Sequence, residues 1–461
     1  MSGFYVTTAI PYVNAAPHLG HALELVQADA LARHRRRRGG DVRFLTGTDD
    51  NALKNVTAAR AAGVPTGDFV AANAARFAGL RGPLDLSFDD FISTSTDPRH
   101  ADGVRRLWAE CGHDFYRRRY EGLYCNGCER FLDGDSCPEH AEPPAPVAEE
   151  NWFFRLSRYQ ARLLDALESR ELDIVPAARR NEVLAFVRAG LRDISVSRPA
   201  ARADGWGVPV PGDPSQVVYV WWDALANYVT ALSEGSDYQR WWVEAERVHV
   251  IGKGIVRFHA VHWPALLLSA GRPLPSRLFV HDYLTVDGAK ISKSAGTAVD
   301  PAALVAEFGT DAVRWWLLRD PAPNGTTDFT ADRLRTRANQ DLANGLGNLV
   351  HRTVKLRAGR PLAAGDDLAA DLPGRIDRAL AAFDFREATE AVIEAVDRLN
   401  RVIEAERPWQ LAHPEAVLAT LVRSARTVAA ELVPFLPGGA ARLRAQLRDG
   451  AAPAPVFPRL G

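Results

Sequence analysis

The first 50 residues contain a strand pattern, a helix pattern and a second strand pattern in immediate succession. Residues 4–10 form an apolar run rich in β-formers that ends at Pro11. Residues 19–37 carry apolar side chains on one helical face and stop before two glycines. Residues 42–46 form the second strand pattern, and a polar cluster follows at residues 47–51. Because open parallel sheets bind ligands at the carboxyl ends of their strands, the sequence predicts an α/β fold with a ligand site there.

The rest of the chain divides into an interruption, a return of the strand and helix patterns, and a helical end. Residues 111–213 combine a cysteine-rich loop, proline-rich turns and two helix patterns. Residues 217–221 and 247–251 are interpreted as returning strands, followed by a helix through residues 259–263. From about residue 339 onward, Leu and Val recur at three- and four-residue spacings, which predicts a helical bundle.

Composition narrows the class of protein. A chain of 461 residues with 47% hydrophobic and 25% charged residues is long enough to bury several cores. No leader pattern is present and the longest apolar stretches are too short to span a bilayer, so we expect a cytoplasmic protein with no membrane partner.

At a net charge of -1, any nucleic-acid contact must come from local patches. The basic run at residues 33–38 is a candidate, but cations also suit the last turn of a helix, and we favour that interpretation.

Two imidazoles stand at the start of the first predicted helix, in Pro17-His18-Leu19-Gly20-His21. Backbone N–H groups at a helix N-terminus favour an anion, and imidazoles can donate hydrogen bonds to a phosphate whose charge grows during reaction. Gly20 lets a flat base approach the backbone closely. Taken alone, the pattern favours two solvent-facing histidines at a helix end.

A second motif, at residues 284–294, is a turn that carries Lys290 and Lys293 among small hydroxyl residues. On its own it is typical of a surface loop. Together with the upstream histidines, and in this order, it resembles the second of the two signatures of class I aminoacyl-tRNA synthetases. The resemblance implies that the carboxylate of an amino acid attacks the α-phosphate of ATP and that pyrophosphate leaves. Catalysis would then consist of positioning and charge stabilisation.

The resemblance also implies roles for the matching residues. His18 and His21 would hold the phosphates, and Lys293, helped by Lys290, would stabilise the leaving pyrophosphate. These four are the expected catalytic residues. Mg²⁺ is expected to accompany ATP, whose expected contacts are His18, Gly20, His21, Lys290, Ser292 and Lys293.

Within this class the chain resembles the methionyl-tRNA synthetases over essentially its whole length. The matching sequence segments are residues 8–12, 124–125, 149–157, 179–183, 190–198, 220–225 and 251–259. The implied function is that of a methionine--tRNA ligase, which activates L-methionine with ATP to methionyl-adenylate and transfers it to tRNA(Met) for initiation and elongation of protein synthesis.

A methionine site needs an apolar, polarizable slot for the thioether and a carboxylate for the ammonium group. The resemblance to the family implies that Asp49 is the carboxylate that pairs with the ammonium group. It also implies that the slot is formed by Ala9, Ile10, Tyr12, Trp221, Ala224, Leu225, Tyr228, Ile255 and His259.

Four residues have the spacing of a structural zinc site: Cys125, Cys128, Cys137 and His140. Disulfides are the alternative, and a reducing cytosol disfavours them. The loop between the two pairs looks short for the family, so a knuckle with weaker zinc affinity is an open alternative. Cys111 has no partner in this scheme and is interpreted as a small buried apolar residue.

Three residues near the end of the chain resemble the family's readers of the methionine anticodon. Asn348 and Arg352 are four apart and therefore share one helix face. Trp409 can stack on an unpaired base, which is how proteins commonly bind single-stranded RNA loops. tRNA(Met) is therefore the expected macromolecular partner.

The expected fold class is α/β, and the resemblance implies five segments. Residues 1–113 and 217–282 would be the two halves of a Rossmann-type catalytic domain, interrupted at 114–216 by a connective insertion with the zinc knuckle. Residues 283–338 would link to an α-helical anticodon-binding bundle at 339–461 and would carry the lysine signature. Because no appended dimerising domain is expected after residue 461, we expect a monomer.

One segment departs from the family. Where the family usually reads Thr-Asp-Glu-His-Gly, this chain has Thr48-Asp49-Asp50-Asn51-Ala52. One alternative is therefore a paralog that activates another amino acid or feeds a small-molecule pathway. A non-catalytic tRNA-binding or regulatory protein is a third possibility, against which the intact His18, His21, Lys290 and Lys293 argue.

Overall fold

The computed structural model describes residues 3–125, 130–132, 134–137, 143–232, 234–291, 298–358, 360 and 363–461, with the backbone alone for Arg130 and Lys290. The chain forms two compact units, which are described separately. The first unit comprises residues 1–17, 41–79 and 88–280, and the second comprises residues 18–40, 80–87 and 281–461. In the part of the chain that is described, no helix is long and apolar enough to cross a membrane.

The first unit is built on a six-stranded sheet in the order β3-β2-β1-β12-β13-β7. The strands are β1 (Phe4–Thr8), β2 (Val42–Thr48), β3 (Asp90–Ser93), β7 (Asp173–Val175), β12 (Glu246–Gly252) and β13 (Arg277–His281). Strand β1 pairs in parallel with both β2 and β12. All five residues of β1 are buried, which explains its continuous run of apolar and β-branched side chains. The predicted α/β fold and the strands near residues 4–10, 42–46 and 247–251 are confirmed.

The predicted strand at residues 217–221 is wrong in two respects. Strand β11 (Asp213–Val218) lies in a separate sheet, where it pairs antiparallel with β9 (Ser197–Pro199) and β10 (Pro209–Val210). Helix α7 (Val220–Thr230) begins only two residues after β11 ends. Because a short apolar run has no period of its own, the Val and Trp residues here could not be divided between strand and helix from sequence.

The interruption of the sheet contains a long β-hairpin that the sequence did not reveal. Strand β4 (Phe115–Cys125) pairs antiparallel with β6 (Ala145–Phe154), and β5 (Arg130–Leu132) and β8 (Ile194–Ser195) flank them. The two predicted helices are present as α5 (Gln160–Glu168) and α6 (Ala177–Arg188).

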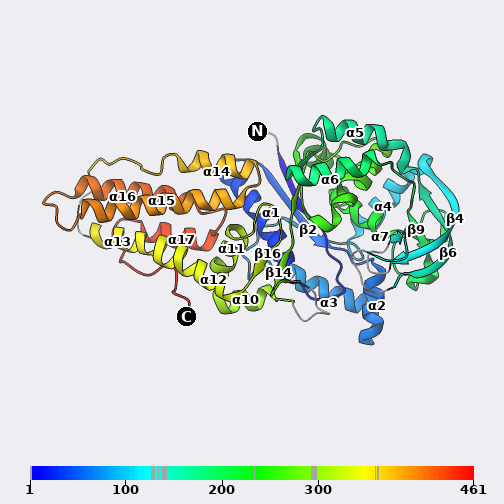
Figure 1. The fold of residues 1–461 in the computed structure, drawn as a ribbon, viewed down its shortest axis with the longest axis horizontal. Helices are drawn as coiled ribbons and strands as arrows, with labels where there is room; N and C mark the ends of the chain where they lie inside the picture. The colour runs from blue at the N-terminus through cyan, green and yellow to red at the C-terminus, as the bar shows by residue number, and fades with distance from the viewer. Residues whose placement is uncertain are drawn as a thin grey trace. The chain divides into compact units, whose positions relative to one another are not determined.

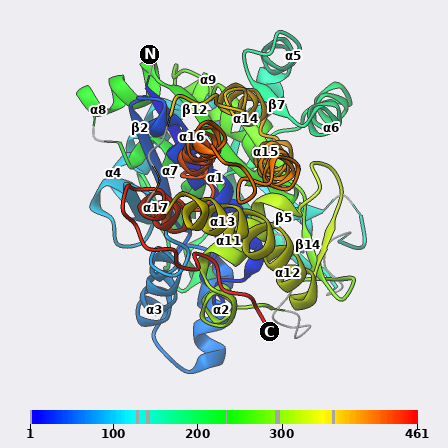
Figure 2. The same ribbon diagram turned by 90° about the vertical axis from the view of Figure 1, so that its left-hand side faces the viewer.

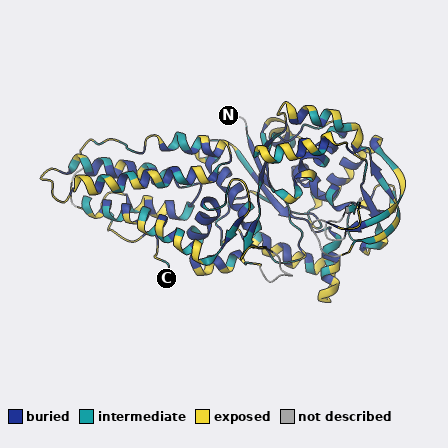
Figure 3. Ribbon diagram, in the orientation of Figure 1, coloured by how far each residue is buried: buried dark blue, intermediate teal, exposed yellow. Residues whose placement is uncertain are grey.

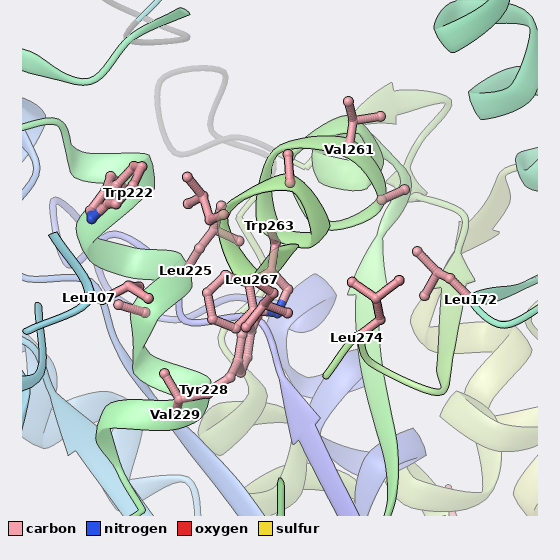
Figure 4. Packing of buried hydrophobic residues seen from close by; sticks show 14 of the residues in the cluster. Leu107, Leu172, Trp222, Leu225, Tyr228, Val229, Val261, Trp263, Leu267 and Leu274 are labelled. Atoms are coloured by element: carbon pink, nitrogen blue, oxygen red, sulfur yellow. The ribbon is translucent and has the colours of Figure 1, made fainter. Parts of the chain in front are cut away.

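The core of the first unit lies around α7, α4 (Pro98–Glu110) and α9 (Trp263–Ser269). Figure 4 shows Leu225, Tyr228 and Val229 of α7 facing Trp263 and Leu267 of α9. The rings of Tyr228 and Trp263 lie 5.9 Å apart between centroids. Since fully burying one such side chain stabilises the fold by roughly 1.5–3 kcal/mol, this packing fixes where α7 lies.

The second unit begins with α1 (Leu19–Arg37) and continues into a small sheet of β14 (Leu284–Val286), β15 (Ala289–Lys290) and β16 (Thr327–Phe329). The helices that follow are α10 (Pro301–Phe308), α11 (Thr310–Arg319), α12 (Ala331–Arg337), a π-helical segment (Ala338–Gly347), α13 (Asn348–Arg357), α14 (Leu372–Ala381), α15 (Phe385–Glu406), α16 (Glu415–Glu431) and α17 (Pro437–Gln446).

Figure 1 shows α13, α15 and α16 side by side, and Figure 2 shows them nearly end-on with α17. Their buried residues fall on one face of each helix, as the burial colours of Figure 3 show. In α15 this face includes Ala388, Val392, Val396, Leu399 and Ile403, spaced by three or four residues. The predicted C-terminal bundle is confirmed.

A buried ion pair ties α1 to the rest of the second unit. Arg314 Nη2 of α11 lies 2.8 Å from Asp29 Oδ2 of α1, and both side chains are fully buried. Arg314 also donates to the carbonyl oxygens of Leu84 at 2.9 Å and Phe435 at 2.8 Å. Burial alone would raise the pKa of Asp29, but the charges of Arg314 and Arg33 and the hydroxyl of Ser87 hold it below its ordinary value.

The basic run at the end of α1 makes ion pairs within the second unit. Arg37 and Arg38 both bind the carboxylate of Glu431, at 2.8 and 2.7 Å, and Arg38 also binds Asp377 at 2.8 Å. Arg36 donates to the hydroxyl of Ser87 at 2.8 Å. This pairing supports the interpretation of the run as a helix end.

We predict that Arg314→Met lowers the stability of the protein by about 3–5 kcal/mol, because Asp29 would remain buried without its cation. Urea unfolding followed by tryptophan fluorescence is the measurement. Arg335→Met is the control, since Arg335 pairs with Asp332, whose side chain is 89% exposed, and should cost less than about 1 kcal/mol. Equal losses in the two variants would contradict the prediction.

Candidate active site

The residues predicted to hold the methionine side chain lie together in the first unit. They come from the chain after β1, from α7, and from the segment after β12. The Tyr12 ring meets the Trp221 ring edge-on, with 6.2 Å between centroids. Trp221 in turn stacks on Phe258 at 3.7 Å. The slot residues that keep partial exposure are Ala9, Ile10, Tyr12, Trp221 and Ile255, whereas Ala224, Leu225, Tyr228 and His259 are buried.

Tyr228 and His259 form a hydrogen-bonded pair beneath this group. The Tyr228 hydroxyl lies 2.7 Å from His259 Nε2, and His259 Nδ1 lies 3.0 Å from the carbonyl oxygen of Ile255. Burial lowers the pKa of His259 to about 4. The ring is therefore neutral at pH 7, with its proton on Nδ1, and accepts the tyrosine hydroxyl proton at Nε2.

Asp49 lies directly after β2, where it makes an isolated β-bridge with Tyr12. Its backbone N–H donates to the carbonyl oxygen of Pro11 at 2.9 Å. Its side chain is only 2% exposed and accepts a hydrogen bond from the backbone N–H of Asn51 at 3.3 Å. The predicted ammonium anchor therefore lies in the same region as Tyr12, Trp221 and the rest of the predicted slot.

The segment after Asp49 joins a polar network that the sequence did not reveal. Asn51 Nδ2 donates to Asp223 Oδ2 at 2.6 Å, and Asp223 Oδ1 lies 2.8 Å from His100 Nε2. Asp50 accepts hydrogen bonds from Ser93 and Ser95, and burial raises its pKa. Asn51 and Asp223 are 172 positions apart, and His100 and Asp223 are 123 apart, so no local motif points to this network.

The histidine motif forms the start of α1 in the second unit. His18 is the N-cap residue: its Nδ1 accepts the backbone N–H of Gly20 at 3.1 Å, and His21 Nδ1 accepts the backbone N–H of His18 at 3.1 Å. The two rings stack at 3.8 Å. Burial, with further contributions from His18 and His281, lowers the pKa of His21 well below its ordinary value. A neutral His21 with Nδ1 as acceptor carries its proton on Nε2.

The second signature begins with a short hairpin in the same unit. Strands β14 and β15 pair antiparallel, and the backbone of Lys290 closes β15. Ser292 and Lys293 lie outside the described residues. Just beyond them, the carbonyl oxygen of Val299 accepts the backbone N–H of Leu19 at 3.0 Å. Within the second unit, this bond holds the chain that follows the lysine signature against the start of α1.

The predicted zinc ligands are described only in part. Cys125 ends β4 and is 2% exposed, and Cys137 is 8% exposed. Cys128 and His140 lie outside the described residues, and among the residues that are described no group of three metal-ligating side chains occurs. Cys111 is fully buried, in accord with its interpretation as a small core residue.

The predicted anticodon residues lie on the bundle. Asn348 begins α13 and is exposed, and Arg352 Nη1 lies 2.7 Å from Glu404 Oε1 near the end of α15. Trp409 follows three residues after α15 ends and is 48% exposed, which is unusual for so large an apolar ring. The ion pair places Arg352 beside the helix end from which Trp409 extends.

Comparison with known proteins gives consistent results. The family model described as "tRNA synthetases class I (M)" matches residues 4–145 and 137–354. The methionine--tRNA ligase of Rhizobium meliloti (strain 1021) is 38% identical, over 99% of this chain and 98% of that protein, and that of Mycobacterium bovis is 41% identical, over 90% and 84%. The crystal structure of Mycobacterium tuberculosis methionyl-tRNA synthetase bound by methionyl-adenylate is 35% identical and superimposes with a TM-score of 0.91, over 99% of this chain and 100% of that one.

We predict that the stability of the protein falls as the pH drops from about 6.5 toward 4. The pKa of His259 is lowered from 6.5 to about 4, so between these values the unfolded chain binds a proton that the folded chain excludes. Through this one group, the free energy of unfolding decreases by on the order of 3 kcal/mol at pH 4. Thermal unfolding across this pH range measures it.

His259→Gln is the matched control, because glutamine can accept the Tyr228 hydroxyl proton without titrating. Its unfolding temperature should depend less steeply on pH than that of the parent. Identical pH profiles would show that His259 does not contribute.

Proposed function

The chain belongs to the methionyl-tRNA synthetase family of class I tRNA synthetases, and on this premise we propose that it joins L-methionine to tRNA(Met) using ATP. It is a methionine--tRNA ligase. The observation that carries this conclusion is similarity along the full length of relatives with that activity, at 35–41% identity. Protein synthesis, both initiation and elongation, is the use we propose for the product.

The reaction has two steps. In the first, a carboxylate oxygen of methionine attacks the α-phosphorus of ATP, the bond to the β-phosphate breaks, and pyrophosphate leaves. In the second, a terminal ribose hydroxyl of the tRNA attacks the carbonyl carbon of methionyl-adenylate, and AMP leaves. No covalent bond to the protein is needed, so the protein acts by positioning and by stabilising charge.

We propose that the methionine side chain binds the slot assigned above and that Asp49 pairs with its ammonium group. The stacked Trp221 and the Tyr228–His259 pair support this assignment, because their ring faces are apolar and polarizable and the Tyr228 hydroxyl is already bonded to His259. A neutral His259 also places no positive charge in a slot for an uncharged thioether. Asp49 is buried beside Tyr12, so an unpaired ammonium would find its counter-ion there.

For ATP, we propose that His18, Gly20 and His21 contact the nucleotide, together with Lys290, Ser292 and Lys293. The imidazole of His21 donates as a neutral group, which suits a phosphate already accompanied by a metal ion. The bond from Leu19 to Val299 supports a shared role for the two signatures, because it brings both into one structural unit. Lys293 and Lys290 supply the positive charge for the leaving pyrophosphate.

For tRNA(Met), we propose that Asn348, Arg352 and Trp409 bind the anticodon. An exposed indole just after the end of α15 and a guanidinium paired with Glu404 of that helix offer one group that stacks and one that donates to a base edge. The five-segment division at residues 113, 216, 282 and 338, action in the cytoplasm and a monomeric state remain part of the proposal.

Two metals complete the proposal. Zn²⁺ would be held by Cys125, Cys128, Cys137 and His140 and would stabilise the fold of the insertion. The burial of both described cysteines fits such a set, since a zinc-bound thiolate is shielded from water. Elemental analysis of protein purified without added metal tests this, and zinc content that is unchanged in Cys125→Ser would contradict it. Mg²⁺ would enter bound to ATP and neutralise phosphate charge.

We predict methionine-dependent exchange of pyrophosphate into ATP that falls by about a hundredfold or more in His21→Ala and Lys293→Ala, because both groups act on charge that develops during the reaction. Lys355→Ala, which removes an exposed lysine of α13, is the matched control and should leave exchange unchanged. A panel of amino acids decides the substrate. Exchange that responds to another amino acid and ignores methionine would instead favour the paralog that the Asp50-Asn51-Ala52 segment suggests.

We predict that Trp409→Ala and Arg352→Ala lower tRNA charging while sparing pyrophosphate exchange. Loss of one base stack costs roughly 1–3 kcal/mol, which corresponds to a rise in the KM for tRNA of about fivefold or more. Leu411→Ala is the control, since Leu411 is also exposed but cannot stack. Parallel losses in charging and exchange would mean that Trp409 and Arg352 serve the fold.

A further inference from the structure

Two side chains from separate parts of the first unit, His100 and Asn51, meet at the buried carboxylate of Asp223. Asp223 lies in the first turn of α7 and is 1% exposed, and His100 of α4 is fully buried. Asp223 Oδ1 lies 2.8 Å from His100 Nε2, and Asp223 Oδ2 accepts the side-chain amide of Asn51 at 2.6 Å. We propose that this brace of His100, Asp223 and Asn51 sets the position of the Asp49 loop against helix α7 and thereby sets the affinity for methionine.

The inference rests on the proposed function, because it takes Asp49 as the anchor for the ammonium group and α7 as the carrier of the side-chain slot. Helix α7 supplies Trp221, Ala224, Leu225 and Tyr228 of that slot. The two groups recognise opposite ends of one amino acid. A methionine fits only when the distance between them matches its length, so whatever fixes that distance determines affinity and selectivity.

The imidazole of His100 is held at both of its nitrogens. A carboxylate can only accept, so the proton lies on Nε2 and is donated to Asp223. Nδ1 lies 2.8 Å from the hydroxyl of Thr230, which is also on α7. Asp223 and Thr230 are seven residues apart and therefore lie on one face of the helix, two turns from each other. His100 thus grips α7 at two points and leaves the ring no freedom to turn.

A glycine allows the two helices to come this close. A Cβ atom on Gly103 of α4 would lie 2.4 Å from Thr230 Cγ2 and 2.8 Å from Thr230 Cβ. Gly103 is one turn after His100, so its missing side chain is what permits the imidazole to reach both partners on α7.

On the other side of the brace, Asn51 is coupled to Asp49 through the backbone. The backbone N–H of Asn51 donates to Asp49 Oδ1 at 3.3 Å, and its side-chain amide also approaches the carbonyl oxygen of Thr94 at 3.4 Å. The backbone N–H of Asp50 donates to the hydroxyl of Thr94 at 2.9 Å. A shift of Asn51 relative to α7 therefore moves the carboxylate that would receive the ammonium group. His100, Asp223 and Asn51 are positioning residues, since they act through Asp49 and α7.

The test compares Asn51→Ala with Asn51→His in pyrophosphate exchange, with KM measured separately for methionine and for ATP. Alanine removes the donor to Asp223, and histidine, the residue usual in the family, restores an N–H donor. We expect Asn51→Ala to raise the KM for methionine about tenfold, the loss typical of a hydrogen bond to a charged group. The KM for ATP should change less than about twofold, and Asn51→His should recover most of the loss. Asn324→Ala, in an exposed loop, is the control.

A second comparison uses His100→Gln, alone and combined with Asn51→Ala. Because both residues act through one carboxylate, their effects on the KM for methionine should be smaller in combination than the product of the single effects. A methionine KM that does not change in Asn51→Ala, or one that rises together with the KM for ATP, would overturn the inference and leave the proposed function standing. A parent protein with no methionine-dependent exchange would overturn the proposed function, and the inference with it.

Discussion

Carboxylates removed from water determine how both units are built. Asp29 lies fully buried on α1, and the second unit supplies it with Arg314, Arg33 and the backbone and hydroxyl of Ser87. An ion in the interior is tolerated only when it is paired and its remaining lone pairs accept hydrogen bonds. Arg314 is equally constrained, and carbonyl oxygens at Leu84, Pro434 and Phe435 satisfy its other N–H groups. Helix α1, which has His18 and His21 at its start, is therefore anchored through Asp29 to α11 and, through Arg314, to the chain before α17.

The same constraint operates in the first unit with different donors. An imidazole and a side-chain amide bond to Asp223, and this contact involves no arginine. The contrast with Asp29 lies in the partner: a buried guanidinium pairs with Asp29, whereas His100 and Asn51 connect Asp223 to the loop that carries Asp49, where an ammonium group is proposed to bind.

Local pattern was enough to predict the strands around residues 4–10, 42–46 and 247–251, the helix at residues 19–37 and the terminal bundle. These segments have either continuous apolar runs or a clear helical period. It was not enough for residues 217–221, where β11 changes to α7 within two residues, nor for the β4–β6 hairpin, whose strands carry mixed polar residues on a partly exposed surface. The slot residues were found through family resemblance, whereas His100 was missed. Its partners Asp223 and Thr230 lie more than 120 positions away, and only tertiary structure brings them together.

The segment Asp50-Asn51-Ala52 departs from the family text, and the structure shows how the chain accommodates it. Glycine is favoured where φ is positive, but Ala52 has φ −68° and ψ 141°, an extended conformation open to any residue. The loop therefore needs no glycine to reach α2 (Leu53–Ala62), and alanine brings no strain. Asn51 in turn supplies a side-chain N–H to Asp223 at 2.6 Å, a bond that an imidazole at the same position could also make. What the substitution removes is the ability to become a cation. An asparagine there can never compete with a substrate ammonium group for the surrounding carboxylates, whereas a histidine can do so at low pH. The Asn51 side chain thus keeps the hydrogen bond to Asp223 and cannot become charged, which is compatible with retained methionine binding.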